Sequence, residues 1–591
     1  MKQIINKFAG LAMLTLPMTG FMACSDDYMA GLNIDETKSE TIDPNAQLTT
    51  ALLQPYGDFS LMDTYRSYIF AFNQHVGGSW NTTNYGGSVF ANNDQMGLVW
   101  NQFYNVGIKN LVDGIHNTES KPNINAALRI QRVYMTSILT DFYGDVPFSE
   151  AGVGYIGGIS TPKYDSQEEI YNEFFKELDA CIAQLGTGND IITGDVTNYS
   201  GDIKKWKKYA NTLRMRFAMR ISDVNPQKAQ EEFEKAVKAD CGYIASAEDN
   251  AYVKFIDGPF TLYDGARDLD FRVNALGEVS YGQDPTSPTF ICTTLYKQMQ
   301  DTQDPRLQRI ARHYLNVKRS EISPDELGNV DVTAEVMAFE ASEEGQLAAG
   351  KWYSCNVGAA WYNNWVSCPS DLTKIPTLAK LVEVYPLAGY NENNCNNRMM
   401  RPFLSIRLEK PDCPGIIITS AETEFLLAEA KLLGWDVPGE VAEHYEAGIR
   451  ASMAVLNNYY NLEYDEIGSI TQAEIDAFVA ANPLGANPKC DINTQAWILH
   501  LTNPAEAWSN LRRADYPVLW DRTLLERFDG FTYGDDLRTP VRLHYPNLES
   551  KYNSANYKAA IDKMGGNDDW HARVWWDKAD IHYDLPAELK Q

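Results

Sequence analysis

The sequence predicts a mainly α-helical protein in which pairs of helices support a loop-rich, irregular lobe. Two observations lead to this fold class. Several regions carry apolar residues at helical spacing and fall into pairs, whereas long stretches between them are rich in Gly, Pro, Asn and aromatic residues. With 591 residues, 44% of them hydrophobic, the chain can bury an extensive core.

Composition sets the first limits on function. The chain carries 51 basic and 79 acidic residues, a net charge of −28. This balance argues against nucleic acid as a partner and against attraction to an anionic membrane by charge alone. Aromatic residues make up 12% of the chain, which permits a neutral ligand that stacks on rings.

The N-terminus predicts export and lipid anchoring. A positively charged start and a short apolar stretch over residues 8–16 have the anatomy of a signal peptide covering residues 1–23. Ala23 directly before Cys24 resembles a bacterial lipoprotein box, in which Cys24 becomes the acylated first residue. Cleavage nearby, with Cys24 left as an ordinary thiol, is the alternative.

Residues 24–50 are expected to form a flexible tether, because the polar run after the cysteine has no helical or strand period. Asp26 and Asp27 resemble the acidic signal that directs Bacteroidetes lipoproteins to the outer face of the outer membrane. No later stretch is apolar for long enough to span a bilayer, so we expect membrane contact through the lipid anchor only. Residues 51–591 are expected to form a single domain.

The clearest helix is predicted over residues 167–185, where apolar side chains recur on one face. Ser166 and Glu169 form a capping box at its start, and Gly186 can close its end.

A second apolar stripe predicts a helix over residues 206–221. Arg214, Arg216 and Arg220 lie off this stripe. Ion pairs between helices or a solvated face are favoured over contact with a ligand.

Residues 419–456 predict two helices separated by Gly434 and by the Pro438-Gly439 turn. Their length and their small residues at close-packing positions are typical of one tetratricopeptide-type hairpin. His444 lies on an apolar face of the second helix and is expected to be a core histidine rather than a catalyst.

Similar stripes predict about four helix pairs in all. The further candidates are residues 94–117 with 124–142, and 472–481 with 494–511. The expected scaffold covers about residues 92–250 and 417–515, and the expected loop-rich lobe covers about 251–416 and 516–591, with short strands. Loops of this length are usually functional.

Two segments outside any stripe combine aromatic rings with amide side chains, residues 75–87 and 351–365. Sugars present an apolar face and hydroxyl groups, so a sugar site needs flat rings beside hydrogen-bonding groups. The alternative is that these loops simply pack onto the scaffold. The predicted ligand-binding residues are Trp80, Asn81, Asn84, Tyr85, Trp352, Trp361, Tyr362 and Trp365.

The sequence offers little for catalysis or metal binding. It has no GxSxG, HExxH or P-loop motif and no cysteine pair at zinc spacing, so no catalytic residue, metal or cofactor is predicted. Cys355 and Cys368 flank one aromatic loop and are the single pair proposed for a disulfide test. Carboxylates are too numerous for carboxylate catalysis to be excluded by counting, but those over residues 422–429 fall within a helix and are expected to be polar-face or packing groups.

Several motifs, taken in order, resemble those of SusD/RagB-like nutrient-binding lipoproteins. They are Thr140-Asp-Phe-Tyr-Gly-Asp-Val-Pro-Phe-Ser-Glu-Ala151, residues 162–170, 206–220, 304–307, 421–430 and 445–449, Ala507-Trp508 with Arg512-Arg513 and Tyr516-Pro517, and Tyr545-Pro546 with Glu549 and Arg573-Val-Trp-Trp-Asp577. The resemblance extends from Cys24 to about Asp577.

The resemblance implies a binding protein, not an enzyme, that captures oligosaccharides or other glycans at the cell surface. It also implies delivery of the ligand to a SusC-like, TonB-dependent barrel in the outer membrane. Residues 75–87 resemble, in position, a glycan-contacting loop of this family. RagB-like relatives suggest peptides as the alternative ligand, and a hydrolase on a helical scaffold is a third, less favoured reading.

Overall fold

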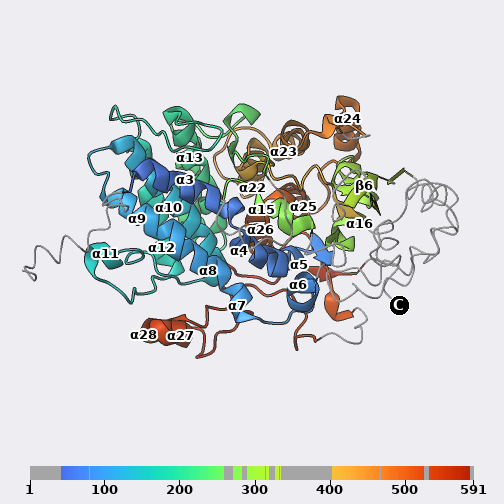
Figure 1. Ribbon diagram of the computed structural model, residues 1–591. Helices are drawn as coiled ribbons and strands as arrows, with labels where there is room; N and C mark the ends of the chain where they lie inside the picture. The colour runs from blue at the N-terminus through green and yellow to red at the C-terminus, as the bar shows by residue number, and fades with distance from the viewer. Residues whose placement is uncertain are drawn as a thin grey trace, which may run out of the picture. The chain divides into compact units, whose positions relative to one another are not determined.

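The computed structural model describes residues 42–78, 80–258, 271–281, 289–312, 314–318, 327–331, 333–334, 402–464, 467–524 and 532–585. The chain divides into a first unit, Met1–Asp43, and a second unit, Pro44–Gln591, which contains every element discussed below. Within the second unit, helices stand side by side in antiparallel succession, as Figure 1 shows for α10, α12 and α13.

The first helix corrects the predicted tether. Helix α3 spans Pro44–Gly57, so residues 44–50 belong to the folded unit. Leu48 is fully buried, and Gln47, also buried, donates a hydrogen bond to Asp113 at 2.7 Å. Polar composition suggested a solvated segment here, but these polar side chains find partners inside the protein.

The first scaffold block confirms the two helices that the stripes predicted. Helix α12 spans Gln167–Gln184 with the expected capping box, and α13 spans Ile203–Arg220. They pack between α10 (Pro122–Tyr143) and α14 (Pro226–Val237).

The single helix predicted over residues 94–117 is divided into shorter elements. These are α7 (Asn93–Met96), α8 (Leu98–Gln102), the π-helical turn η3 (Phe103–Ile108) and α9 (Lys109–His116). Gly107 lies so close to α10 that a Cβ atom there would be 2.2 Å from Met135 Cε. The π-helical turn η3 therefore lies where Gly107 packs closely against α10.

The second block contains the predicted hairpin. Helices α22 (Ser420–Leu432) and α23 (Val441–Tyr459) lie against each other, with Gly448 of α23 directly over the Phe425 ring. Helix α24 (Gln472–Ala481) follows, as expected.

One helix boundary in this block was predicted wrongly. Instead of one helix over residues 494–511, α25 (Pro488–Leu499) and α26 (Pro504–Ala514) are separated by the 3-10 turn η9 (His500–Thr502). Pro504 cannot continue a helix from its N-terminal side, because it lacks the amide proton and clashes with the preceding turn. It opens α26 instead.

The rest of the described chain consists of short strands, short helices and irregular segments, and it includes the described parts of the lobe predicted over about residues 251–416 and 516–591. Its strands form two-stranded pairs: β1 (Val76–Gly78) with β3 (Thr289–Ile291), β2 (Ala251–Val253) with β8 (Gly415–Ile418), β4 (Ala311–Arg312) with β7 (Phe403–Leu404), β5 (Tyr314–Lys318) with β6 (Leu327–Asp331), and β9 (Leu519–Trp520) with β10 (Tyr583–Asp584). The remaining short helices are α4 (Phe59–Thr64), η1 (Tyr65–Ile69), α5 (Phe70–Phe72), α6 (Trp80–Thr82), η2 (Thr83–Gly87), α11 (Gly154–Gly157), η4 (Ala247–Asp249), α15 (Ala275–Tyr281), α16 (Thr293–Asp301), α17 (Leu307–Ile310), η8 (Leu462–Tyr464), η10 (Arg522–Leu524), α27 (Glu549–Tyr552) and α28 (Ser554–Asp562).

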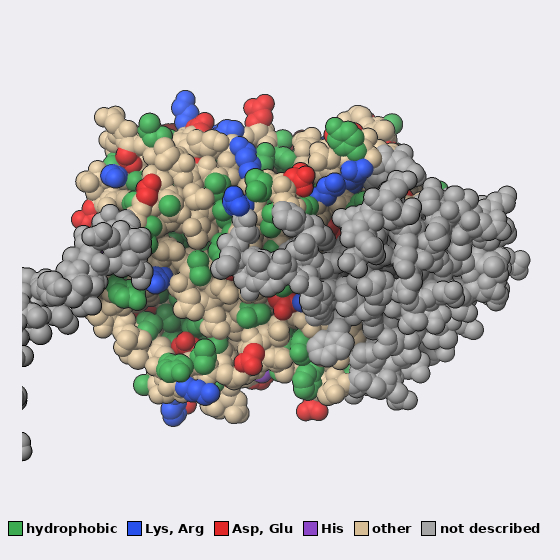
Figure 2. All heavy atoms as spheres, in the orientation of Figure 1, with side chains coloured by type: hydrophobic (Ala, Val, Ile, Leu, Met, Phe, Trp, Pro, Cys, Tyr) green, Lys and Arg blue, Asp and Glu red, His purple; other side chains and the backbone are tan. Residues whose placement is uncertain are grey.

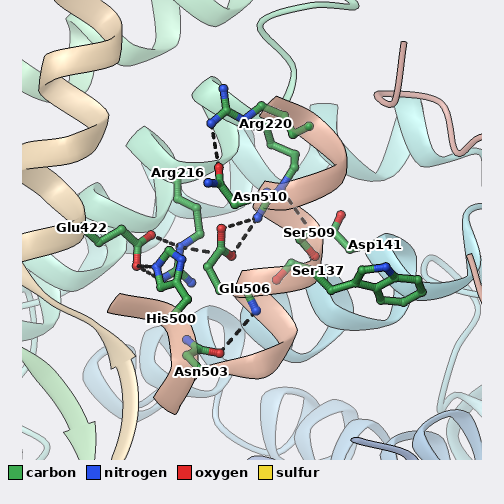
Figure 3. A network of polar contacts seen from close by, with 12 residues as sticks. Ser137, Asp141, Arg216, Arg220, Glu422, His500, Asn503, Glu506, Ser509 and Asn510 are labelled. Atoms are coloured by element: carbon green, nitrogen blue, oxygen red, sulfur yellow. Dashed lines mark hydrogen bonds and ion pairs between the residues drawn. The ribbon is translucent and has the colours of Figure 1, made fainter. Parts of the chain in front are cut away.

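Buried ion pairs join the scaffold helices, which confirms the interhelix alternative for the three arginines. Arg216 Nε lies 2.6 Å from Glu422 Oε1, and Arg220 Nη2 lies 2.6 Å from Glu506 Oε1 (Figure 3). Arg214 pairs with both Asp179 and Glu232. Because these side chains lie on α12, α13, α14, α22 and α26, the pairs connect helices from both scaffold blocks.

Candidate ligand-binding face

The first predicted ligand segment, residues 75–87, contains strand β1, helix α6 and the π-helical turn η2. Strand β1 pairs antiparallel with β3, with Val76 opposite Ile291. Helix α6 and the π-helical turn η2 follow directly. π-Helical turns are rare and are frequent at functional sites.

The structure places the four predicted residues of this segment on consecutive turns. Trp80 opens α6, and Asn81 follows it with only 6% of its surface exposed. Asn84 and Tyr85 lie on η2 and are half-buried. The other four predicted residues, Trp352, Trp361, Tyr362 and Trp365, lie outside the described residues, as does the Cys355–Cys368 pair.

Tyr85 is the outer ring of an aromatic stack. Its ring lies 5.9 Å from that of Tyr68, with the planes inclined by 25°. Tyr68 is buried, its hydroxyl accepts a hydrogen bond from the Asn92 amide at 2.7 Å, and Trp570 meets it edge-on at 6.3 Å. Phe90, 40% exposed, follows a few residues later. The orientation of the Tyr85 ring is therefore fixed by buried rings beneath it.

Beneath Asn81 lies a charged pair that the sequence did not single out. Arg66 pairs with Asp63, and Asn81 Nδ2 lies 3.5 Å from Asp63 Oδ1. The Arg66 side chain is only 5% exposed and that of Asp63 14%. The available signal was the aromatic run around Tyr65 and Tyr68, whose helical stripe marks a packed element close to the segment.

The backbone is strained at both ends of the segment. Gln74 has φ +53° and Val89 has φ +50°. The left-handed region is unfavourable for any residue with a Cβ atom and most unfavourable for a β-branched one such as valine. Such conformations persist only where the surroundings over-determine them, and they cluster at ligand-binding and active sites.

Contacts from distant parts of the chain hold the segment in place. The Gly86 carbonyl accepts a hydrogen bond from Arg522 Nη1 at 2.9 Å, and the Ser88 carbonyl accepts one from the Gly534 amide at 2.9 Å. A Cβ atom on Gly86 would lie 2.7 Å from the Ser67 carbonyl oxygen. A loop fixed in this way loses little conformational entropy when it binds a ligand.

His75, at the start of the segment, belongs to the core. It is fully buried, and its ring lies 4.6 Å from that of Trp497. Burial lowers the pKa of His75 to about 3, so the imidazole is neutral at physiological pH. It supports the segment from below and makes no contact with solvent.

The carboxylates that the hydrolase alternative would require on α22 are ion-paired inside the scaffold. Glu422 lies between Arg216 and His500 in the network of Figure 3, and Glu429 pairs with Arg513. Burial alone would raise the pKa of Glu422, but Arg216 and His500 lower it to about 2. These groups are structural, as the sequence predicted for residues 422–429.

His444 differs from the prediction in its environment. It is half-buried, and its two ring nitrogens lie 2.6 Å from Glu424 Oε2 and 2.7 Å from the Pro438 carbonyl oxygen. The hydrogen bond to Glu424 raises the pKa of His444. The residue fastens the turn between α22 and α23 and is not a core histidine.

The described residues contain no group of three or more His, Cys, Asp or Glu side chains arranged to hold a metal ion. In the same part of the chain, no helix combines the length and hydropathy that a membrane span requires. On the face shown in Figure 2, basic and acidic side chains are interspersed.

Comparison with known proteins identifies the class. The chain matches a family model described as "Starch-binding associating with outer membrane" over residues 38–345 and 384–546. A solved Bacteroidetes SusD-like protein is 38% identical, with a TM-score of 0.79, and the match covers 91% of this chain and 100% of the other. A solved chitin-binding protein is 31% identical, with a TM-score of 0.67 and coverage of 91% and 100%.

A SusD homologue from Bacteroides fragilis, 20% identical with a TM-score of 0.63, covers 90% of this chain and 100% of its own length and shows the shared fold. No match was found among the curated proteins.

The paired helices, together with the match to this family model and to the SusD-like relative over most of the chain, define the class as a mainly helical binding protein associated with the outer membrane. The chain belongs to the SusD-like family of nutrient-binding outer-membrane proteins, which confirms the resemblance and the fold class drawn from the sequence. The family is non-catalytic, so the protein is a binder and not an enzyme.

Proposed function

We propose that the mature protein is a cell-surface lipoprotein, anchored through Cys24, that captures oligosaccharides and delivers them to a SusC-like, TonB-dependent barrel. The observation that carries the ligand class is the rigid segment at residues 80–90, where an aromatic ring and amide side chains lie on consecutive turns. Flat rings beside amide groups suit the apolar faces and hydroxyl groups of sugars.

The relatives support a glycan over a peptide. One solved structure that is 31% identical over nearly its whole length is named a chitin-binding protein. The family description names starch binding. A peptide-binding role, as in RagB-like proteins, is the alternative and is an outcome of the test below.

The expected affinity is modest. Stacking one sugar face on one indole ring contributes roughly 1 kcal/mol at about 25 cal/mol per Å². Three such rings with a few hydrogen bonds, less the ordering cost, give a dissociation constant between about millimolar and tens of micromolar. Many anchored copies on one surface would add avidity.

Affinity electrophoresis tests the ligand class. Purified mature protein is run in native gels that contain plant, host or microbial polysaccharides, with serum albumin as the migration control. Retardation by at least one polysaccharide is expected. Migration unchanged in every gel, together with binding to a peptide library, would replace the glycan by a peptide.

Export and partnership need separate measurements. Wild-type protein is expected in the detergent phase after labelling with a fatty-acid analogue, and Cys24→Ala is expected to abolish the label. Co-purification of a large TonB-dependent barrel from solubilised outer membranes is expected with the wild type. Recovery of the unlabelled protein from the cytosol would contradict the anchor.

A further inference from the structure

A cavity lies on the scaffold, formed by elements other than those of the 75–90 segment. It has a volume of about 230 Å³ and is bounded by α22, α23 and the loop that precedes β2. In Figure 1 α22 and α23 lie together in the upper part of the molecule. Two other cavities lined by described residues hold about 10 Å³ each, which suits no more than a water molecule.

The floor of this cavity is made by one side of α23. Ala447, Ala451 and Ala454 recur at helical spacing, are half-buried, and line the cavity. Alanine side chains leave room directly above the helix and present methyl groups. The floor is therefore apolar and shallow enough for a ring to lie on it.

Polar groups make up the walls. Ser246 comes from the exposed loop, Ser420 and Glu424 from α22, and Asn458 from the end of α23. They offer two hydroxyl groups, a carboxylate and an amide, which together can accept and donate several hydrogen bonds.

Asn250 connects the three elements that form the cavity, so the cavity is already formed without a ligand. Its Oδ1 accepts a hydrogen bond from the Ser420 amide at 2.7 Å, and its Nδ2 donates to the Tyr459 hydroxyl at 3.0 Å. Asn250 is 1% exposed. The loop, α22 and α23 are thus connected through one buried side chain.

The charge of Glu424 is already compensated, which decides the kind of ligand. His444 Nδ1 lies 2.6 Å from Glu424 Oε2, and His444 Nε2 lies 2.7 Å from the Pro438 carbonyl oxygen. A carboxylate and a carbonyl both only accept hydrogen bonds, so a ring that makes both bonds carries both protons and is cationic. A ligand charge of either sign therefore gains little from this paired carboxylate, which favours a neutral ligand.

We infer that this cavity binds a single neutral, polyhydroxylated ring, such as one monosaccharide unit, with its apolar face on the alanines of α23. The volume lies below the roughly 300 to 1,000 Å³ of sites for larger ligands, so the cavity holds one ring and not several. Glu424 Oε1, which makes no hydrogen bond among the described residues, would accept from ring hydroxyl groups. This cavity would be an additional sugar site beside the one proposed at the 75–90 segment, because it is formed by other elements.

Saturation-transfer NMR on the mature protein tests the cavity independently of the first segment. The Trp80→Ala variant is titrated with D-glucose and with N-acetyl-D-glucosamine. We expect saturation transfer to at least one of the two sugars, and at least a tenfold loss of it when Ala451→Leu is added to fill the cavity. Ala442→Leu, an exposed position on the same helix outside the cavity, is the matched control and is expected to leave the signal unchanged.

A second cavity variant keeps the test valid if Ala451→Leu fails to fold. A longer sugar shows whether the cavity binds a free monosaccharide or the end of a chain. Asn458→Leu removes an exposed amide from the wall and is expected to weaken the signal as well. Comparing glucose with maltotriose separates a free sugar from the end of a chain, because a chain end would show transfer to one terminal ring only. No transfer in Trp80→Ala, or equal transfer in Ala451→Leu, would overturn the inference, whereas failure of polysaccharide retardation in the wild type would concern only the proposed function.

Discussion

The helical scaffold and the 75–90 segment are stabilised in different ways. In the scaffold, apolar periodicity and local caps define each helix, and buried Arg–Glu pairs join neighbouring helices. In the segment, the elements are only a few residues long, two strained backbone positions lie at its ends, and Arg522 and Gly534 donate hydrogen bonds to the Gly86 and Ser88 carbonyls. Local signals therefore specify the framework, while long-range contacts specify the segment proposed to bind the ligand.

The environments of two histidines also differ between the scaffold and the segment. His444 in the scaffold is half-buried beside a carboxylate, which raises its pKa. His75 under the segment is fully buried beside the Trp497 ring, and burial lowers its pKa. The two residues are therefore expected to make stability depend on pH in opposite directions.

The largest effect is expected from breaking a scaffold ion pair. Arg216→Met leaves Glu422 buried beside Glu506 without its principal counter-charge, which should lower the free energy of unfolding by about 3–5 kcal/mol. Lys563→Ala, which removes an exposed pair with Asp145, is the control and should cost less than about 1 kcal/mol. Chemical denaturation measures both, and equal losses would mean that the buried network does not stabilise the scaffold.

The next effect is the pH dependence from His75. Its folded pKa of about 3 lies below the ordinary value of 6.5, so the unfolded chain takes up the proton first. The stabilising contribution is complete above pH 6.5 and is lost toward pH 3, at up to about 1.4 kcal/mol per pH unit. His75→Gln should flatten the stability profile between these values. His116→Gln, at an exposed position, should leave it unchanged, and a profile unaltered by His75→Gln would contradict the burial argument.

A smaller effect on stability is expected from a substitution that displaces the 75–90 segment. Gly86→Ala forces a Cβ atom to within 2.7 Å of the Ser67 carbonyl oxygen, so η2 must shift. We expect a stability loss of about 1–3 kcal/mol and a several-fold loss of glycan affinity. Gly157→Ala, where the nearest atom is 3.8 Å away, is the matched control. Wild-type affinity in Gly86→Ala, measured by calorimetry, would show that the position of η2 is unimportant.

The smallest effect concerns His444. Its pKa is raised, so its contribution is complete below its ordinary value of 6.5 and is lost as the pH rises through the folded value. Because the side chain is half-buried, His444→Gln should lower the free energy of unfolding by less than about 1 kcal/mol. This loss is expected only at pH values below the folded pKa of His444. Thermal melts at pH 5.5 and pH 9 compare the two forms, and a greater loss at pH 9 would reverse the assigned sign.

The scaffold was predictable because its signals are local. The capping box of Ser166 and Glu169 and the stripe over residues 206–221 each define an element without knowledge of the rest of the chain. Errors arose where tertiary contacts decide the outcome. Polar residues of α3 are buried with partners far along the chain, and Pro504 begins a new helix where the apolar stripe continued.

The segment was predictable in composition and not in geometry. Its aromatic and amide residues were visible in the sequence, but the stacking of Tyr85 on Tyr68 depends on two elements meeting in space. The left-handed backbone of Val89 has no sequence signal, because valine is the least expected residue for it. The Asp63–Arg66 pair was also missed, because only the fold brings it next to Asn81.

The central claim is that rings and amides of the segment at residues 80–90 hold a glycan. Isothermal titration of the retained polysaccharide's oligomers into wild-type protein and Trp80→Ala tests it most directly, with Tyr155→Ala, an exposed aromatic on α11, as the matched control. We expect Trp80→Ala to weaken binding at least about tenfold, or about 1.4 kcal/mol, with an unchanged melting temperature, and Tyr155→Ala to bind as the wild type does. Equal affinity of Trp80→Ala and wild type would contradict the account.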